Sequence, residues 1–204
     1  VQLDRPLDFM IVADHAEMLA VPLRLMEGDP KLTSTETGQR WLRMMQEGKS
    51  SELLEKELEP SMRSSTAIAD FNDEELKEAA WSDVVAAAER HYAPCAFTSF
   101  IGWEWSSEPD GLGLHRVVFM NRGGEQAREF VPFSSLDGRR PEDLWSWLEE
   151  TSTRAGTDFI AIPHGSNLSG GTMYPEVDSD GRPITASYAR TRMRWEPVSE
   201  VTQI

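Results

Sequence analysis

The 204-residue chain contains a single cysteine, Cys95, and few basic residues. One cysteine excludes an internal disulfide and the zinc sites built from several thiolates. It is compatible with either the cytosol or the periplasm, so the compartment stays open. The chain has 20 Lys and Arg against 35 Asp and Glu, a formal net charge of −15. This charge repels nucleic acid and anionic membranes, so neither is expected as a partner.

Long apolar runs and several common catalytic motifs are also missing. No apolar run approaches the roughly 18 residues that a transmembrane helix needs, so no membrane span is expected. A Walker loop, a Gly-x-Ser-x-Gly elbow and a His-Glu-x-x-His helix are absent, which argues against P-loop NTPases, α/β-hydrolases and zincins. The hydrophobic fraction of 39% and seven tryptophans fit one globular domain over residues 1–204.

Hydrophobic periodicity predicts alternating strands and helices. Apolar runs predict buried strands at 7–13, 97–105, 114–120 and 159–163. Amphipathic spacing and capping residues predict helices at 35–48, 51–62, 72–92, 141–155 and 188–193. The order of strands and helices favours an α/β fold with a mainly parallel sheet. The chain opens at Val1 without an initiator Met, and both ends fall near expected strands, so a fragment of a longer protein is predicted.

Three of the four histidines fall at the ends of predicted strands. His15 and His164 each follow a strand directly, and His115 begins the third one. Glu104 lies near the end of the second strand, and it would neighbour His115 if the second and third strands form a hairpin. Because the carboxyl ends of strands form the functional rim of α/β sheets, these side chains are expected to converge. His91, in the last turn of a helix, is interpreted as structural.

Three imidazoles and a carboxylate form a suitable ligand set for a divalent transition metal. Ions held in this way lower the pKa of bound water, supply a nucleophilic hydroxide and offset charge on a phosphoryl oxygen. Taken singly, a histidine after a strand can simply cap backbone groups, and Glu104 could be a buried carboxylate paired with Arg116. The joint placement favours a metal site.

Several motifs resemble those of the polymerase and histidinol phosphatase (PHP) superfamily. Val12-Ala13-Asp14-His15 resembles its Thr-Asp-His motif, and Gly102-Trp103-Glu104 its Gly-x-Glu motif. His115 and His164 match its next two histidine positions in order. A closer similarity is to a PHP-like group catalogued as a domain of unknown function. It covers nearly the whole chain, through the segments 5–9, 100–105, 114–116, 141–145 and 161–164.

The resemblance implies a distorted (βα)7 TIM-like barrel, with mainly parallel strands and the helices outside. It implies two or three divalent metal ions (zinc, manganese or iron) and hydrolysis of a small phosphoester by metal-bound hydroxide. On this pattern His15 binds one ion, Glu104 bridges two, and His115 and His164 complete the second. Glu104 and Asp14 are the expected catalytic residues, with Asp14 orienting a ligand histidine.

Two further residues, Arg116 and Asn167, are candidates for holding the anionic group of the substrate. The chain departs from the family pattern, because the opening His-x-His and the closing Asp-x-His are absent and Ala13 replaces threonine. A partial barrel without its first and last strands is therefore expected, and it could be inactive alone. The alternatives are a non-catalytic barrel fragment that serves as a binding module, and an amidohydrolase-like enzyme that acts on C–N or C–O bonds. The oligomeric state stays open.

Overall fold

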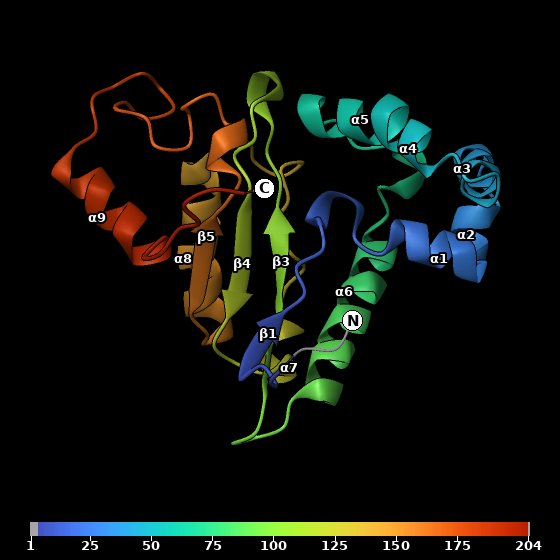
Figure 1. Ribbon diagram of the computed structural model, residues 1–204, viewed down its shortest axis with the longest axis horizontal. Helices are drawn as coiled ribbons and strands as arrows, with labels where there is room; N and C mark the ends of the chain where they lie inside the picture. Colours follow the sequence, from blue (N-terminus) through green and yellow to red (C-terminus); the bar gives the residue numbers. More distant parts are fainter. Residues whose placement is uncertain (1–3, 204) are drawn as a thin grey trace.

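The computed structural model describes residues 4–203 and shows a mixed α/β fold with two small sheets. One sheet pairs β1 (Phe9–Ile11) with β2 (Thr98–Phe100) in parallel. The other has the order β3 (Gly102–Trp105), β4 (Arg116–Met120) and β5 (Phe159–Pro163). Figure 1 shows the strands side by side in the centre, with helices to either side and behind. No closed barrel is found within residues 4–203.

The expectation of a mainly parallel sheet is wrong for the three-stranded sheet. β4 pairs antiparallel with both β3 and β5. For β3 and β4 the physical reason is the short connection 106–115, because a parallel neighbour needs a crossover of a dozen or more residues, usually a helix. The second and third predicted strands thus form the hairpin that was the condition for bringing Glu104 next to His115. Since β4 alone is reversed, β3 and β5 run in the same direction and end at the same edge.

The helices fall into two groups along the chain. The first group lies between β1 and β2 and comprises α1 (Val21–Glu27), α2 (Pro30–Thr33), α3 (Glu36–Gln46), α4 (Ser50–Leu53), the π-helical turn η2 (Leu54–Leu58), α5 (Glu59–Ser64) and α6 (Glu74–His91). The second comprises α7 (Gly124–Ala127), α8 (Pro141–Ala155) and α9 (Ala186–Trp195). Short 3-10 turns are η1 (Ala16–Met18), η3 (Ala69–Phe71), η4 (Pro109–Gly111) and η5 (Ser166–Leu168). None of the helices described is long and apolar enough to cross a membrane.

Local sequence explains most helix boundaries, with two corrections. The helix predicted from residue 72 begins at Glu74 instead, with Asp73 as its N-cap, whose side chain accepts a hydrogen bond from the Leu76 N–H. The single helix predicted over 51–62 is interrupted by η2, where Glu57 accepts hydrogen bonds from Arg40 and Trp41 of α3. Pro60 follows, so α5 begins as a new helix.

The register of the three strands determines which side chains share a face. Directly paired residues point the same way, so Trp103, Val118 and Ala161 lie together and are fully buried. This face packs against α6 and α8 and forms the main core. Glu104, which pairs with Val117, therefore points to the opposite face. A second, separate core joins α1, α2, α3 and α4.

Candidate metal centre

The structure brings His15, Glu104, His115 and His164 together at one edge of the sheets. His15 follows β1 and forms a parallel bridge with Glu104 in β3. His115 directly precedes β4, and His164 directly follows β5. The His164 N–H donates to the His115 carbonyl at 3.2 Å. The four side chains thus come from the ends of three strands (β1, β3 and β5) and the start of β4 at the same edge.

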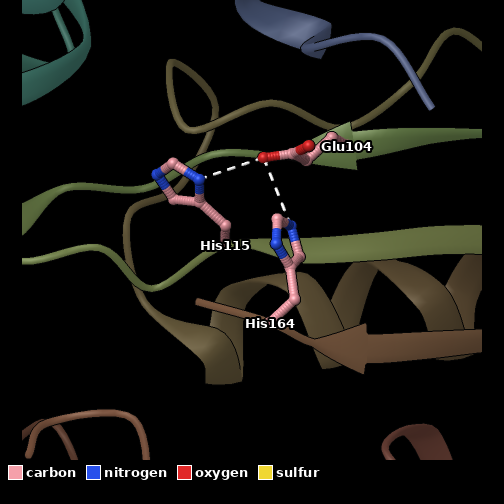
Figure 2. A group of neighbouring side chains, drawn as sticks. All are labelled: Glu104, His115 and His164. Atoms are coloured by element: carbon pink, nitrogen blue, oxygen red, sulfur yellow. Dashed lines mark ion pairs between the residues drawn. The ribbon is translucent and has the colours of Figure 1, made fainter. Parts of the chain in front are cut away.

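One carboxylate oxygen is the centre of the group. Oε1 of Glu104 lies 3.0 Å from Nδ1 of His115, 3.3 Å from Nε2 of His164 and 3.5 Å from Nδ1 of His15. Figure 2 shows Glu104, His115 and His164 pointing toward one another from adjacent strands. Ligand atoms from these three residues all lie within 4.8 Å of one another.

This group fits a divalent metal ion. Glu104 is 8% exposed. The buried Nε2 atoms of His115 and His164 lie 3.3 Å from Oε1 of Glu108 and of Glu104 respectively, but neither makes a well-formed hydrogen bond within residues 4–203. Buried polar atoms are almost always well paired, and a metal ion would satisfy these nitrogens better than the distant carboxylate oxygens do. Two imidazoles with a carboxylate are a common ligand set for zinc and related ions. The side chain of His15 is 49% exposed and lies at the border of the group.

The electrostatics of the site are dominated by the pairing of carboxylates with histidines. Burial opposes ionisation of Glu104, but the close imidazoles of His115 and His164 outweigh it and hold the pKa of Glu104 well below its usual range. Burial likewise disfavours a charged His115, yet the carboxylates of Glu104 and Glu108 raise the pKa of His115 to about 9. The pKa of Glu108 is lowered as well, because its carboxylate pairs with His115. Without a metal ion, His115 is therefore charged at neutral pH.

We expect the metal-free chain to lose stability as the pH rises from about 6.5 to about 9. The folded pKa of His115 lies near 9 and its reference value is 6.5, so the stabilisation is complete below 6.5 and is lost through 9. The slope from one such proton is at most about 1.4 kcal/mol per pH unit. Urea unfolding in EDTA would measure it. The slope should flatten in His115→Gln and persist in His91→Gln; an unchanged slope in His115→Gln would contradict the assignment.

Two residues that the sequence analysis missed support the ligands. The hydroxyl oxygen of Ser106 lies 2.5 Å from Nδ1 of His15 and 3.1 Å from Oε1 of Glu104. Behind it, Oε1 of Glu17 accepts hydrogen bonds from the N–H groups of Ser106 and Ser135, and burial raises the pKa of Glu17. Ser106 stands two positions after Glu104, so the two-residue period of a strand was a usable signal for it. Nothing in the sequence signals the contact of Glu17 with Ser135.

The predicted substrate role of Arg116 is not supported by its position. Its side chain is 1% exposed, and Nε donates to Oε1 of Glu196 at 3.0 Å. The guanidinium also lies 5.6 Å from the ring centre of Trp105 and donates to the Leu114 carbonyl. Arg116 pairs with Trp105 across the strands and so faces away from Glu104. This arrangement also rules out the alternative in which Arg116 neutralises Glu104, because its carboxylate partner is Glu196.

Asn167 and Asp14 make backbone contacts. The Asn167 side chain donates to the carbonyl of Gln203 and accepts from its N–H, so it anchors residue 203 beside η5. Both ends of the amide are occupied by backbone, which argues against a substrate contact. The Asp14 carbonyl accepts from the Glu104 N–H at 2.8 Å, and its side chain is exposed. Its expected role in orienting a histidine stays a prediction.

A cavity of about 1260 Å³ adjoins the site. His15, His115 and His164 line it, together with Glu108 and Arg63 from the surrounding segments. The volume is above the range of about 300–1,000 Å³ that is typical of small-molecule sites. The three histidines are therefore accessible to a ligand from this cavity.

The comparisons with known proteins give a family and no relative of known activity. No curated protein and no solved structure matches the chain. A family model described as a protein of unknown function, DUF3604, matches residues 1–204, which is the whole chain. The chain therefore belongs to the DUF3604 family.

Proposed function

We propose that this chain carries the metal site of a metal-dependent phosphoesterase. The observation that carries the proposal is the convergence of His15, His115 and His164 within 3.5 Å of one oxygen of Glu104. These histidines lie after β1, before β4 and after β5, and a shared metal ion would bind them together with Glu104. The resemblance to PHP enzymes supplies the reaction class, hydrolysis of phosphoester bonds.

The residues at the site have different roles in this proposal. Glu104, His115 and His164 would hold one ion, and His15 would contribute to a second that shares Glu104. An ion bound there would polarise a phosphoryl oxygen and lower the pKa of bound water. Such a charge matters in a chain with a formal net charge of −15, which otherwise repels an anionic phosphoester. Zinc, manganese and iron are all compatible with two imidazoles and a carboxylate.

We further propose that the two sheets belong to a distorted, partial (βα)7 barrel of the PHP type. Helices α6 and α8 cover one face of the strands, and the site side chains lie on the other face at one edge. This is the layering of a barrel, where helices lie outside and function sits at the ends of the strands. The antiparallel β4 is the distortion that this proposal must include.

The decisive test is metal-dependent hydrolysis with a matched histidine control. The chain, loaded with zinc, manganese or iron, is expected to hydrolyse nitrophenyl phosphates, and His164→Ala should lose more than about 100-fold in kcat/KM together with bound metal. His91→Ala should keep both, because His91 lines the same cavity at the end of α6 but lies outside the ligand group. Metal content by mass spectrometry and nitrophenol release would measure this.

The two alternative functions, a binding module and an amidohydrolase-like enzyme, predict other results. Substoichiometric metal that does not change in His164→Ala would favour a non-catalytic binding module. Hydrolysis of amides or lactones in preference to phosphates would favour an amidohydrolase-like enzyme.

A further inference from the structure

Ser106 lies between two side chains of the metal centre. Its hydroxyl is within hydrogen-bond distance of both Nδ1 of His15 and Oε1 of Glu104. An ionised carboxylate can only accept, so the single hydroxyl proton of Ser106 goes to Glu104. The hydroxyl oxygen must then accept from His15, which places a proton on Nδ1. Ser106 is fully buried, so water does not reach its hydroxyl from the side of the serine, while the ring of His15 is half exposed.

This proton position decides which nitrogen of His15 can bind a metal ion. A neutral imidazole carries one N–H, and when it is on Nδ1 the free lone pair is on Nε2. Histidines that bind metals usually donate their other N–H to a neighbouring oxygen, which fixes both the tautomer and the direction of the ring. At His15 that oxygen is the Ser106 hydroxyl, and the hydrogen bond leaves Nε2 as the ligand atom.

The backbone of Ser106 is itself anchored. Oε1 of Glu17 accepts from the Ser106 N–H at 3.2 Å and from the Ser135 N–H at 2.7 Å. Glu17 belongs to η1, the turn that directly follows His15. The short segment that carries His15 therefore also holds the serine that orients it.

We propose that Ser106, anchored by Glu17, is a positioning residue that fixes His15 as the Nδ1–H tautomer and presents Nε2 to the metal. The consequence for affinity rests on the proposed function, since it requires a metal ion at His15. The tautomer is a property of the metal-free chain and can be measured without metal. The orienting role expected for Asp14 passes to Ser106 under this proposal.

The experiment compares Ser106→Ala with Ser107→Ala. Ser107 is the next residue and is equally buried, but its hydroxyl donates to the Arg139 carbonyl, so its removal leaves His15 untouched. Nitrogen-15 NMR of the four histidine side chains in EDTA, at a pH where His15 is neutral, reports the tautomer. His15→Gln assigns the His15 signals. The Nδ1–H form should dominate in the wild type and in Ser107→Ala, and should lose its dominance in Ser106→Ala.

Zinc affinity, measured by competition with a chelator, is the second readout. Ser106→Ala should bind zinc about 10- to 100-fold more weakly than Ser107→Ala, the usual cost of removing an outer partner of a ligand. Glu17→Ala should weaken zinc binding in the same way. Glu17→Gln, which keeps an oxygen that can accept both N–H groups, should restore most of the affinity.

The outcomes separate this proposal from the proposed function. Loss of zinc in His164→Ala, with Ser106→Ala identical to Ser107→Ala in affinity and tautomer, overturns the role of Ser106 alone. If the wild type binds no zinc, the proposed function fails, and the tautomer still decides the hydrogen-bond assignment. A wild-type His15 found mainly as Nε2–H overturns the proposal whatever the metal result.

Discussion

Replacing Glu104 with glutamine is expected to abolish metal binding and hydrolysis. Oε1 of Glu104 is the atom on which His15, His115 and His164 converge, and no second carboxylate takes its place among the ligand atoms grouped within 4.8 Å in the described part of the chain. Glutamine keeps the shape and removes the charge, so the loss is electrostatic. Removing a residue that only hydrogen-bonds to a metal ligand costs about 10–100-fold in metal affinity. Because Glu104 would be a ligand itself, we expect its loss to lower metal affinity by more than about 100-fold.

Calorimetric titration with zinc and the rate of nitrophenyl phosphate hydrolysis would measure this loss. The matched control is Glu142→Gln, a half-buried carboxylate of α8 whose partners are Ser179 and Tyr188, away from the site. It should bind zinc and turn over substrate as the wild type does. Glu104→Gln should also lose the attraction that keeps His115 charged, so its metal-free form should show a lower pKa at His115. Wild-type zinc affinity in Glu104→Gln would remove the basis for the metal site.

The ligand group could be predicted from sequence because it depends only on where strands end. His15 and His164 follow apolar runs directly, and the short link 106–115 requires a hairpin that brings Glu104 to His115. The same short link argues against a parallel pairing of these two strands, so the antiparallel pairing could also have been predicted from the sequence. The alternation of a strand further implied that Arg116 must face away from its neighbour His115.

The supporting contacts could not be predicted, because they join segments that are far apart in the sequence. Glu17 reaches Ser135 across 118 positions, and Arg116 reaches Glu196 across 80. Neither pairing follows from periodicity or capping. The π-helical turn η2 is a similar case, since it depends on Glu57 meeting Arg40 and Trp41 of another helix. Tertiary contacts override local preference at such points.

Glu196→Gln is expected to be among the most destabilising substitutions in the chain. Glu196 and Arg116 are each about 1% exposed at the side chain, and Glu196 is the carboxylate that pairs with Arg116. Removing one partner of a buried ion pair leaves the other charge desolvated and costs about 3–5 kcal/mol. Urea unfolding should show this loss. The control Glu52→Gln removes an exposed pair with Lys56 and should leave the stability unchanged.

The reverse substitution, Arg116→Met, should cost less than Glu196→Gln. After it, Glu196 keeps Arg192 at 3.0 Å and the Trp145 indole N–H at 2.9 Å, so its charge stays paired. After Glu196→Gln, by contrast, the charge of Arg116 loses its carboxylate, and its remaining partners among the described residues are neutral: the amide oxygen at position 196, the Leu114 carbonyl and the Trp105 ring. This asymmetry also tests the predicted role of Arg116 at the substrate. If Arg116 is structural, Arg116→Met lowers stability and leaves KM for nitrophenyl phosphate unchanged. If Arg116→Met instead has wild-type stability and a raised KM, Arg116 binds the substrate.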